Sequence, residues 1–217
     1  MISAAIFDLD GLMFDSEDLR HGCWVRALED FGYEMTQAFE DASGGISRVR
    51  MLEVLREVYG ADMPAERLLE YEWSLVDEVL AGDVPEKPGL RELLGWLEDH
   101  DVPRAIASSS PMRQIDACLD GTGLRERFDV VVSGTEVARS KPAPDVFLEA
   151  ASRLGVEPAT SLVLEDSFAG VRAGAAGGFV TVMVPDALQP DDEIRSLVAA
   201  CCEDLGEVAS LLEAGRL

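Results

Sequence analysis

Acidic, hydroxyl and lysine side chains occur at four places in the chain, and three of these places directly follow a short apolar run. The residues are Asp8 and Asp10; Ser108, Ser109 and Ser110; Lys141; and Glu165 and Asp166. Four carboxylates brought together would repel one another unless a divalent cation or a shared proton relieved them. Oxygen ligands suit a hard cation, and magnesium keeps several waters while bridging to phosphate oxygens. These residue types therefore favour a magnesium site that acts on a phosphate group.

These side chains would meet if the apolar runs were parallel strands of one sheet, because the carboxyl ends of such strands open on one edge. The sequence predicts strands over residues 2–7, 104–108, 128–133, 161–164 and 179–184. It predicts helices over residues 90–97, 111–119, 144–154, 167–176 and 193–212. Repeated strand–helix units place helices on both faces of a parallel sheet. We therefore expect an α/β fold with a doubly wound, Rossmann-like core.

One long segment near the N-terminus departs from this alternation. Its apolar side chains, such as Trp24, Leu28 and Phe31, follow helical spacing, and a Pro- and Gly-rich linker ends it. We expect two domains, with hinges near residues 12–16 and 83–88. They are an α/β core of residues 1–14 and 89–217 and an inserted helical cap of residues 15–88, linkers included.

In their order along the chain, the polar segments resemble the four motifs of the haloacid dehalogenase superfamily of phosphotransferases. The first, Asp-x-Asp-Gly, stands at residues 8–11, and the second, a hydroxyl residue ending a strand, is Ser108. The third, a lysine before a Pro-rich helix start, begins at Lys141, and the fourth is the acidic pair Glu165-Asp166. The resemblance covers essentially the whole chain. With its cap soon after the first motif, the sequence looks most like the β-phosphoglucomutase-like group of phosphatases.

The resemblance implies a role for each of these residues. Asp8 would attack a phosphomonoester to form an aspartyl-phosphate, and Asp10 would act as general acid and then general base. Mg²⁺ would be held by Asp8, Asp166 and the backbone carbonyl of Asp10, with Glu165 bound directly or one contact further out. The phosphoryl oxygens would be bound by three groups: Ser108, the backbone amide of Ser109, and Lys141.

Two branches of the superfamily fit the sequence poorly. A dehalogenase needs neither a metal nor a general acid, and in that branch the position of Asp10 is not acidic. A phosphonatase would need a cap lysine to form a Schiff base, and residues 15–86 contain no lysine. We therefore expect phosphoryl transfer from a phosphomonoester.

A sugar-phosphate mutase of the same group is an open alternative. The cap segment Gly45-Ile46-Ser47-Arg48 agrees with that branch, and Arg48 is a candidate clamp for the distal end of a substrate. A mutase, however, is expected to have a histidine where Arg20 stands and a lysine where Gly44 stands. Residues 15–17, Asp-Ser-Glu, are more like those of sugar-phosphate phosphatases, so we favour hydrolysis of a sugar phosphate.

A non-catalytic phospho-receiver is an alternative from another class of protein. Receivers also combine an acidic pocket, a hydroxyl residue and a lysine on a doubly wound sheet. A receiver has no use for a second carboxylate such as Asp10 beside its phosphoacceptor, and the helical insertion is also foreign to it. Both features favour the enzyme.

Composition limits the possible partners. The chain has 42 Asp and Glu residues against 18 Lys and Arg residues, a formal net charge of −24. Such a chain repels nucleic acids and anionic membranes, so we expect a small phosphorylated metabolite as partner and leave the oligomeric state open, a monomer included.

Four cysteines without Cys-x-x-Cys spacing indicate reduced thiols. Without a long apolar run or a basic leader, the expected location is the cytoplasm.

Overall fold

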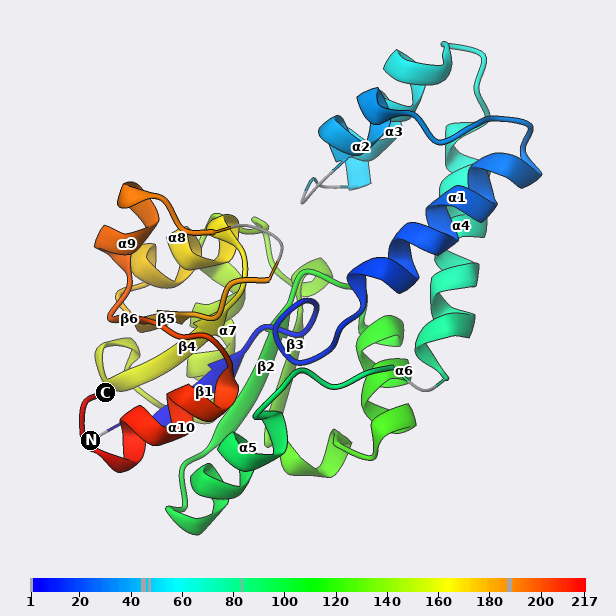
Figure 1. Ribbon diagram of the computed structural model, residues 1–217. Coiled ribbons are helices and arrows are strands. Elements are labelled where there is room, and N and C mark those ends of the chain that lie inside the picture. The colour runs from blue at the N-terminus through cyan, green and yellow to red at the C-terminus, as the bar shows by residue number, and fades with distance from the viewer. Residues whose placement is uncertain (1, 44–45, 47, 83, 187–188) are drawn as a thin grey trace.

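The computed structural model describes residues 2–43, 46, 48–82, 84–186 and 189–217. Six strands form one sheet in the order β3-β2-β1-β4-β5-β6, and every neighbouring pair is parallel (Figure 1). They are β1 (Ala4–Phe7), β2 (Arg104–Ser108), β3 (Val130–Ser133), β4 (Ser161–Glu165), β5 (Val180–Met183) and β6 (Ala200–Cys201). The expected doubly wound α/β sheet is confirmed.

Helices cover both faces of the sheet because successive side chains of each strand point to opposite faces. In β1, Phe7 belongs to an apolar cluster that includes side chains of α5 (Leu90–Asp99), α6 (Met112–Thr122) and α10 (Leu205–Glu213). Ile6 belongs to a second cluster with α7 (Asp145–Leu154) and α8 (Phe168–Ala176). Short 3₁₀ turns lie at Arg125–Arg127, Gly134–Glu136 and Pro158–Thr160. In the described part of the chain, no helix combines the length and the apolar character needed to cross a membrane.

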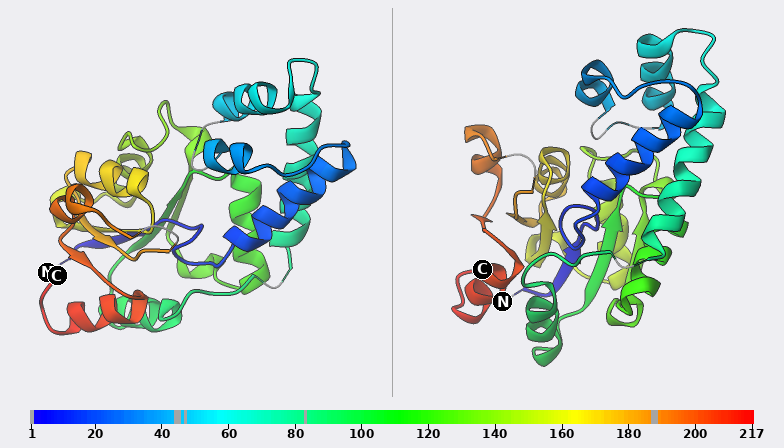
Figure 2. Two further views of the ribbon diagram at one scale, coloured as in Figure 1. Left: turned by 45° about the horizontal axis from the view of Figure 1, so that its top comes forward. Right: turned by 45° about the vertical axis from the view of Figure 1, so that its right-hand side comes forward.

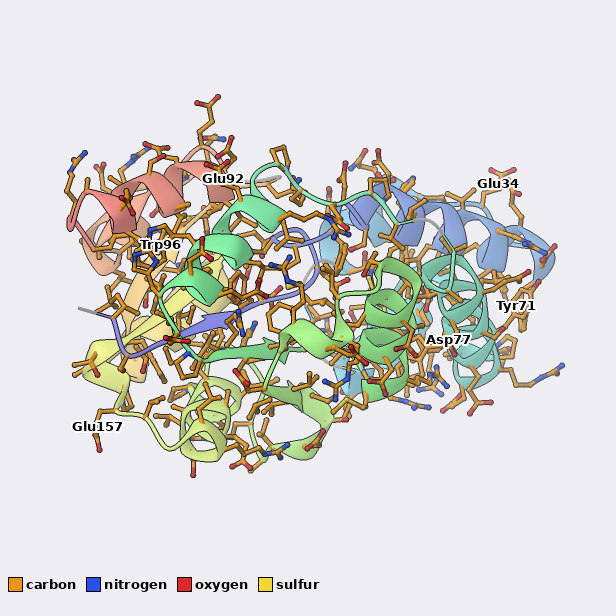
Figure 3. The ribbon with its side chains drawn as sticks, turned by 90° about the horizontal axis from the view of Figure 1, so that it is seen from below. Glu34, Tyr71, Asp77, Glu92, Trp96 and Glu157 are labelled. Atoms are coloured by element: carbon orange, nitrogen blue, oxygen red, sulfur yellow. The ribbon has the colours of Figure 1, made fainter. Side chains whose placement is uncertain are left out.

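Four helices between β1 and α5 form the segment expected to be the cap: α1 (Glu17–Asp30), α2 (Gln37–Ser43), α3 (Arg48–Tyr59) and α4 (Ala65–Leu80). They lie beyond the carboxyl end of β1, to one side of the sheet (Figures 1 and 2). Figure 3 places Glu34 and Tyr71 at the end of these helices remote from the sheet. The rings of Trp24, Phe39 and Tyr59 pack together, with centroids 5.1 and 5.7 Å apart. We call α1–α4 the helical cap, and its being a separate domain stays a prediction.

The two chain segments that join the cap to the core run side by side. The amide of Asp15 donates to the carbonyl of Pro85 at 2.8 Å, and the amide of Lys87 donates to the carbonyl of Met13 at 2.9 Å. Both connections therefore pass from core to cap at one place. Of the expected hinge residues, Asp83 lies outside the described residues.

The single helix predicted over residues 193–212 is wrong. This segment contains α9 (Asp192–Leu197), the short edge strand β6 and α10. Asp191 caps α9 by accepting from the amide of Ile194 at 2.9 Å, and Asp204 caps α10 in the same way. Between the two caps the amide of Cys202 donates to the carbonyl of Met183 at 2.8 Å. The apolar spacing of residues 193–212 alone predicts one helix. The two N-caps, together with the edge of β5 that β6 pairs with, divide this segment into two helices and a strand.

Candidate active site

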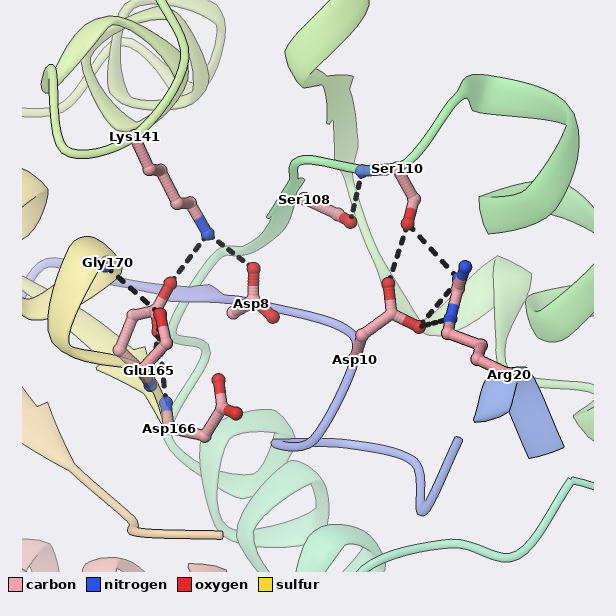
Figure 4. A network of polar contacts seen from close by, with 10 residues as sticks. Asp8, Asp10, Arg20, Ser108, Ser110, Lys141, Glu165, Asp166 and Gly170 are labelled. Carbon is pink, nitrogen blue, oxygen red and sulfur yellow. Dashed lines mark hydrogen bonds and ion pairs between the residues drawn. The ribbon is translucent and has the colours of Figure 1, made fainter. Parts of the chain in front are cut away.

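Three carboxylates meet at the carboxyl ends of β1 and β4 (Figure 4). Asp8 directly follows β1, Glu165 is the last residue of β4, and Asp166 follows it. The amide of Asp8 donates to the carbonyl of Leu164 at 3.0 Å, so the register of the two strands brings the carboxylates together. Each of the three residues offers an oxygen, and these oxygens lie within 4.8 Å of one another.

Lys141 reaches these carboxylates from the loop before α7. Its Nζ donates hydrogen bonds to Asp8 Oδ1 and, at 2.6 Å, to Glu165 Oε1. The side chain is only 6% exposed, and Nζ lies 4.6 Å from the centroid of the Phe147 ring. Burial acts to lower the pKa of Lys141, but the charges of Asp8 and Glu165 outweigh it and raise that pKa. Lys141 is therefore a fixed cation between two carboxylates.

Both oxygens of Glu165 are occupied by hydrogen-bond donors. Oε1 accepts from Lys141, and Oε2 accepts from the amides of Asp166 and Ser167 at 3.0 and 2.9 Å and from Ser167 Oγ at 2.8 Å. Ser167 also caps α8, because its Oγ accepts from the amide of Gly170 at 3.1 Å. A Cβ on Gly170 would lie 1.7 Å from Glu165 Oε1, so only glycine leaves room for this carboxylate.

Burial and neighbouring negative charges oppose the ionisation of Asp166 and Asp8. Burial, and then the charges of Glu165 and Asp8, raise the pKa of Asp166 to about 10. Burial raises the pKa of Asp8 to about 7 against the opposing charge of Lys141. Among the described residues, no other side chain donates a hydrogen bond to the Asp166 carboxylate, and only its own backbone lowers its pKa by a hydrogen bond. Carboxylate oxygens crowded together in this way fit a hard divalent cation, so these residues are compatible with Mg²⁺.

Asp10 lies in the same loop, but its carboxylate points away from Asp8 (Figure 4). Oδ1 accepts from Ser16 Oγ at 2.9 Å and from Arg20 Nε and Nη2 at 3.2 and 2.9 Å. Oδ2 accepts from Ser110 Oγ at 2.7 Å. Burial acts to raise the pKa of Asp10, but the charge of Arg20 and the bonds from Ser110 and Ser16 outweigh it and lower that pKa. Asp10 is thus an ionised carboxylate in this structure.

The serine segment follows β2, which is the neighbour of β1 in the sheet. Ser108 is buried and its Oγ accepts from the amide of Ser110 at 3.0 Å, whereas Ser109 is exposed. Ser133, at the end of β3, donates from Oγ to the carbonyl of Ser110 at 2.7 Å. The structure therefore fixes the position of this turn through β3, beside the loop that carries Asp8 and Asp10.

The structure does not bring Arg48 into the group of carboxylates. Arg48 begins α3, with its Cζ 4.5 Å from the centroid of the Trp73 ring and its Nη2 3.9 Å from Glu70. Of its motif, Gly45 and Ser47 lie outside the described residues, as does Gly44 before it, whereas Ile46 packs against the main apolar cluster. His21 is exposed, with its Nδ1 3.8 Å from Glu40 Oε1.

The sequence interpretation missed the residues around Asp10. It treated Arg20 only as a departure from the mutase pattern, and it gave Ser110 no role in the site beyond its place in the run of three serines. The structure starts α6 at Met112, with Pro111 as its N-cap, and it turns the Ser110 hydroxyl toward Asp10. The run of three serines could have pointed to a further role at this position. The second motif needs only one hydroxyl residue, Ser108, so Ser110 was available to bind another group.

Comparison with known proteins finds a family model, curated relatives and solved structures that are similar to this chain. A family model described as haloacid dehalogenase-like hydrolase matches residues 5–184. Hexitol phosphatase B of Escherichia coli (strain K12) is 33% identical over 190 residues, which cover 85% of this chain and 84% of that protein. The structure of CbbY from Rhodobacter sphaeroides in complex with phosphate has a TM-score of 0.82 at 22% identity and covers 96% of each chain. A putative beta-phosphoglucomutase from Thermotoga maritima has a TM-score of 0.78 at 28% identity, covering 98% of this chain and 99% of that one.

Proposed function

Because the chain belongs to the haloacid dehalogenase-like hydrolases, we propose that it is a magnesium-dependent phosphatase of small phosphomonoesters that works through an aspartyl-phosphate on Asp8. One observation carries the proposal: the buried Lys141 ammonium bonds Asp8 and Glu165, and an oxygen of Asp166 lies within 4.8 Å of theirs. This arrangement supplies a nucleophile, a fixed cation and a place for a metal ion at one edge of the sheet.

In the first step, a carboxylate oxygen of Asp8 attacks phosphorus and forms the aspartyl-phosphate bond. The bond between phosphorus and the ester oxygen breaks. Asp10, whose contacts favour the ionised form, must first take up a proton from solvent, and it passes this proton to the ester oxygen so that the alcohol leaves neutral. Lys141 has three N–H donors, of which two are used by Asp8 and Glu165. Its third donor is available for a phosphoryl oxygen.

In the second step, a water oxygen attacks phosphorus, its proton passes to Asp10, and the bond between phosphorus and Asp8 breaks. The lowered pKa of Asp10 suits this step, because a general base must be ionised. Inorganic phosphate leaves and Asp8 is restored. Ser108 and the amide of Ser109, at the end of β2, bind the phosphoryl oxygens in both steps.

Asp8, Asp166 and the backbone carbonyl of Asp10 would hold the magnesium ion, and Glu165 would act on Lys141 because both of its oxygens are occupied. When bound, the ion supplies positive charge that stabilises the phosphoryl oxygens and lets neighbouring carboxylates stay ionised.

The substrate class is proposed to be a sugar phosphate or a sugar-alcohol phosphate. Hexitol phosphatase B, which aligns over 84% of its own length, supports this class. The fold similarity to a putative beta-phosphoglucomutase keeps a mutase as the second candidate. The cap would close over such a substrate and exclude water, with the paired segments around Met13 and Lys87 as hinges.

Phosphate release from a panel of phosphorylated sugars and sugar alcohols tests both candidates. A phosphatase releases inorganic phosphate from at least one of them in magnesium buffer, and the Asp8→Asn variant releases none. A mutase would instead isomerise a hexose 1-phosphate, primed with a bisphosphate, faster than it hydrolyses it. An Asp8→Asn variant with full activity would show that the proposed nucleophile is wrong.

A further inference from the structure

Arg20 joins the cap to the core side chains around Asp10. It belongs to α1, and its guanidinium donates to three core residues, of which Figure 4 labels Asp10 and Ser110. Nε and Nη2 bond Asp10 Oδ1 at 3.2 and 2.9 Å, Nη1 bonds Gln114 Oε1 at 3.2 Å, and Nη2 also bonds Ser110 Oγ at 3.2 Å. A guanidinium is a rigid planar fork of donors, so these bonds fix both its position and its plane.

Gln114 supports this position from α6. Its side chain is 1% exposed, and Oε1 must face Arg20, because arginine has only donors to offer. Gln114 Nε2 is then left buried without a hydrogen-bond partner among the residues that the structure describes. A buried donor without an acceptor is unfavourable, so the amide is held in an orientation that serves Arg20. Glu72, buried on α4, adds an electrostatic attraction from the cap side.

The two oxygens of Asp10 are held unequally. Oδ1 accepts three hydrogen bonds, from Ser16 and twice from Arg20, whereas Oδ2 accepts one, from Ser110. We propose that Arg20 is a positioning residue that anchors Oδ1, so that Oδ2 is the oxygen that gives its proton to the leaving alcohol. Arg20 also holds the donor to Oδ2 in place, since Ser110 Oγ accepts from Arg20 Nη2 at 3.2 Å. The inference rests on the proposed function, in which Asp10 is the general acid.

In the first step, the bond between Asp8 and phosphorus forms and the bond between phosphorus and the alcohol oxygen breaks. The proton on Asp10 Oδ2 moves to that alcohol oxygen. A poor leaving group such as an alkoxide needs this proton, whereas p-nitrophenolate leaves without it. Loss of the anchor must therefore slow alkyl esters far more than p-nitrophenyl phosphate.

The test compares kcat/KM for p-nitrophenyl phosphate, phenyl phosphate and an alkyl phosphate in wild type, Arg20→Met and Arg20→Lys. This ratio includes only steps up to alcohol release, so it isolates the first step. For Arg20→Met we expect a fall of about 100-fold on the alkyl ester, within the range of general acid catalysis, and of less than about 5-fold on p-nitrophenyl phosphate. Arg20→Lys should fall between Arg20→Met and wild type. Arg26→Met, which removes an exposed arginine from the same helix, should leave all three values unchanged.

A purely structural role for Arg20 would lower all three values by the same factor, and that result would overturn the inference. Equal values in wild type and Arg20→Met would overturn it as well. The Asp10→Asn variant separates this failure from failure of the proposed function. If Asp10→Asn retains wild-type activity on the alkyl ester, Asp10 is not the acid. If Asp10→Asn loses alkyl-ester activity selectively and Arg20→Met does not, only the role of Arg20 is wrong.

Discussion

At the scale of single residues, the carboxylates are held in place by small neighbours as much as by charged ones. Gly11, with φ +79°, leaves space for Asp166, because a Cβ there would lie 2.3 Å from Asp166 Oδ2. Gly170 does the same for Glu165. The sequence predicted the acidic pair from its position after a strand. The need for glycine at residue 170 could not be predicted, because it depends on how α8 turns back over the end of β4.

The Gly170→Ala substitution tests this constraint. Alanine is the better helix former by about 1 kcal/mol, yet its Cβ would overlap Glu165, which must then release Lys141. We expect kcat to fall at least about 100-fold while the protein stays folded. Gly95→Ala is the control, because a Cβ there meets no atom within 4 Å. Full activity in Gly170→Ala, measured as phosphate release, would mean that the Glu165–Lys141 contact is dispensable.

At the scale of elements, the parallel sheet and the strands that carry the polar motifs could be predicted from the sequence. The packing between cap and core could not. Polar residues after β1, β2 and β4 meet because parallel strands end on one edge. Arg20 reaches Asp10 only because α1 packs against α4, which in turn packs against α6 of the core, and no local pattern encodes this packing. The same packing buries Glu72 on α4, close to Arg20 and Arg113.

Glu72 makes stability depend on pH. Burial raises the pKa of Glu72 from 4.5 to about 7, against the charge of Arg20. The unfolded chain therefore loses this proton first, so stability is lost as pH rises from about 4.5 through about 7. We expect Glu72→Gln to raise the melting temperature at pH 8 by a few degrees, for a gain of at most about 3 kcal/mol, and to change nothing at pH 4.5. Glu70→Gln, exposed on the same helix, is the control. If the difference in melting temperature between Glu72→Gln and wild type were the same at every pH, this account of Glu72 would be wrong.

At the scale of the whole molecule, a net charge of −24 opposes the binding of a dianionic substrate. The chain has two lysines, and both lie at the site edge of the sheet: Lys141 on Asp8 and Glu165, and Lys87 on Asp186 at 2.6 Å. With Asp10, Asp166, Arg20 and Asp15, whose Oδ1 lies 3.9 Å from Lys87 Nζ, this edge holds six carboxylates against three cationic side chains. Carboxylates therefore outnumber cations at this edge, and a divalent cation would offset most of the excess.

Removal of metal should therefore weaken phosphate binding as well as turnover. We expect inorganic phosphate, titrated calorimetrically into the protein, to bind at least about 10-fold more weakly in EDTA than in magnesium buffer, because a local cation must offset the acidic surroundings. The Gly95→Ala protein should behave as wild type in both buffers. Equal affinities in EDTA and magnesium would contradict the charge argument.

The central claim is a covalent phosphoenzyme on Asp8, and rapid acid quenching tests it most directly. The Asp10→Asn variant should react with p-nitrophenyl phosphate, whose leaving group needs no acid, but should hydrolyse the intermediate slowly because the general base is absent. We predict a burst of one p-nitrophenolate per protein and one phosphoryl group located on Asp8 by peptide mass mapping. Release of p-nitrophenolate without protein-bound phosphate, or a phosphoryl group on any other residue, would contradict the account.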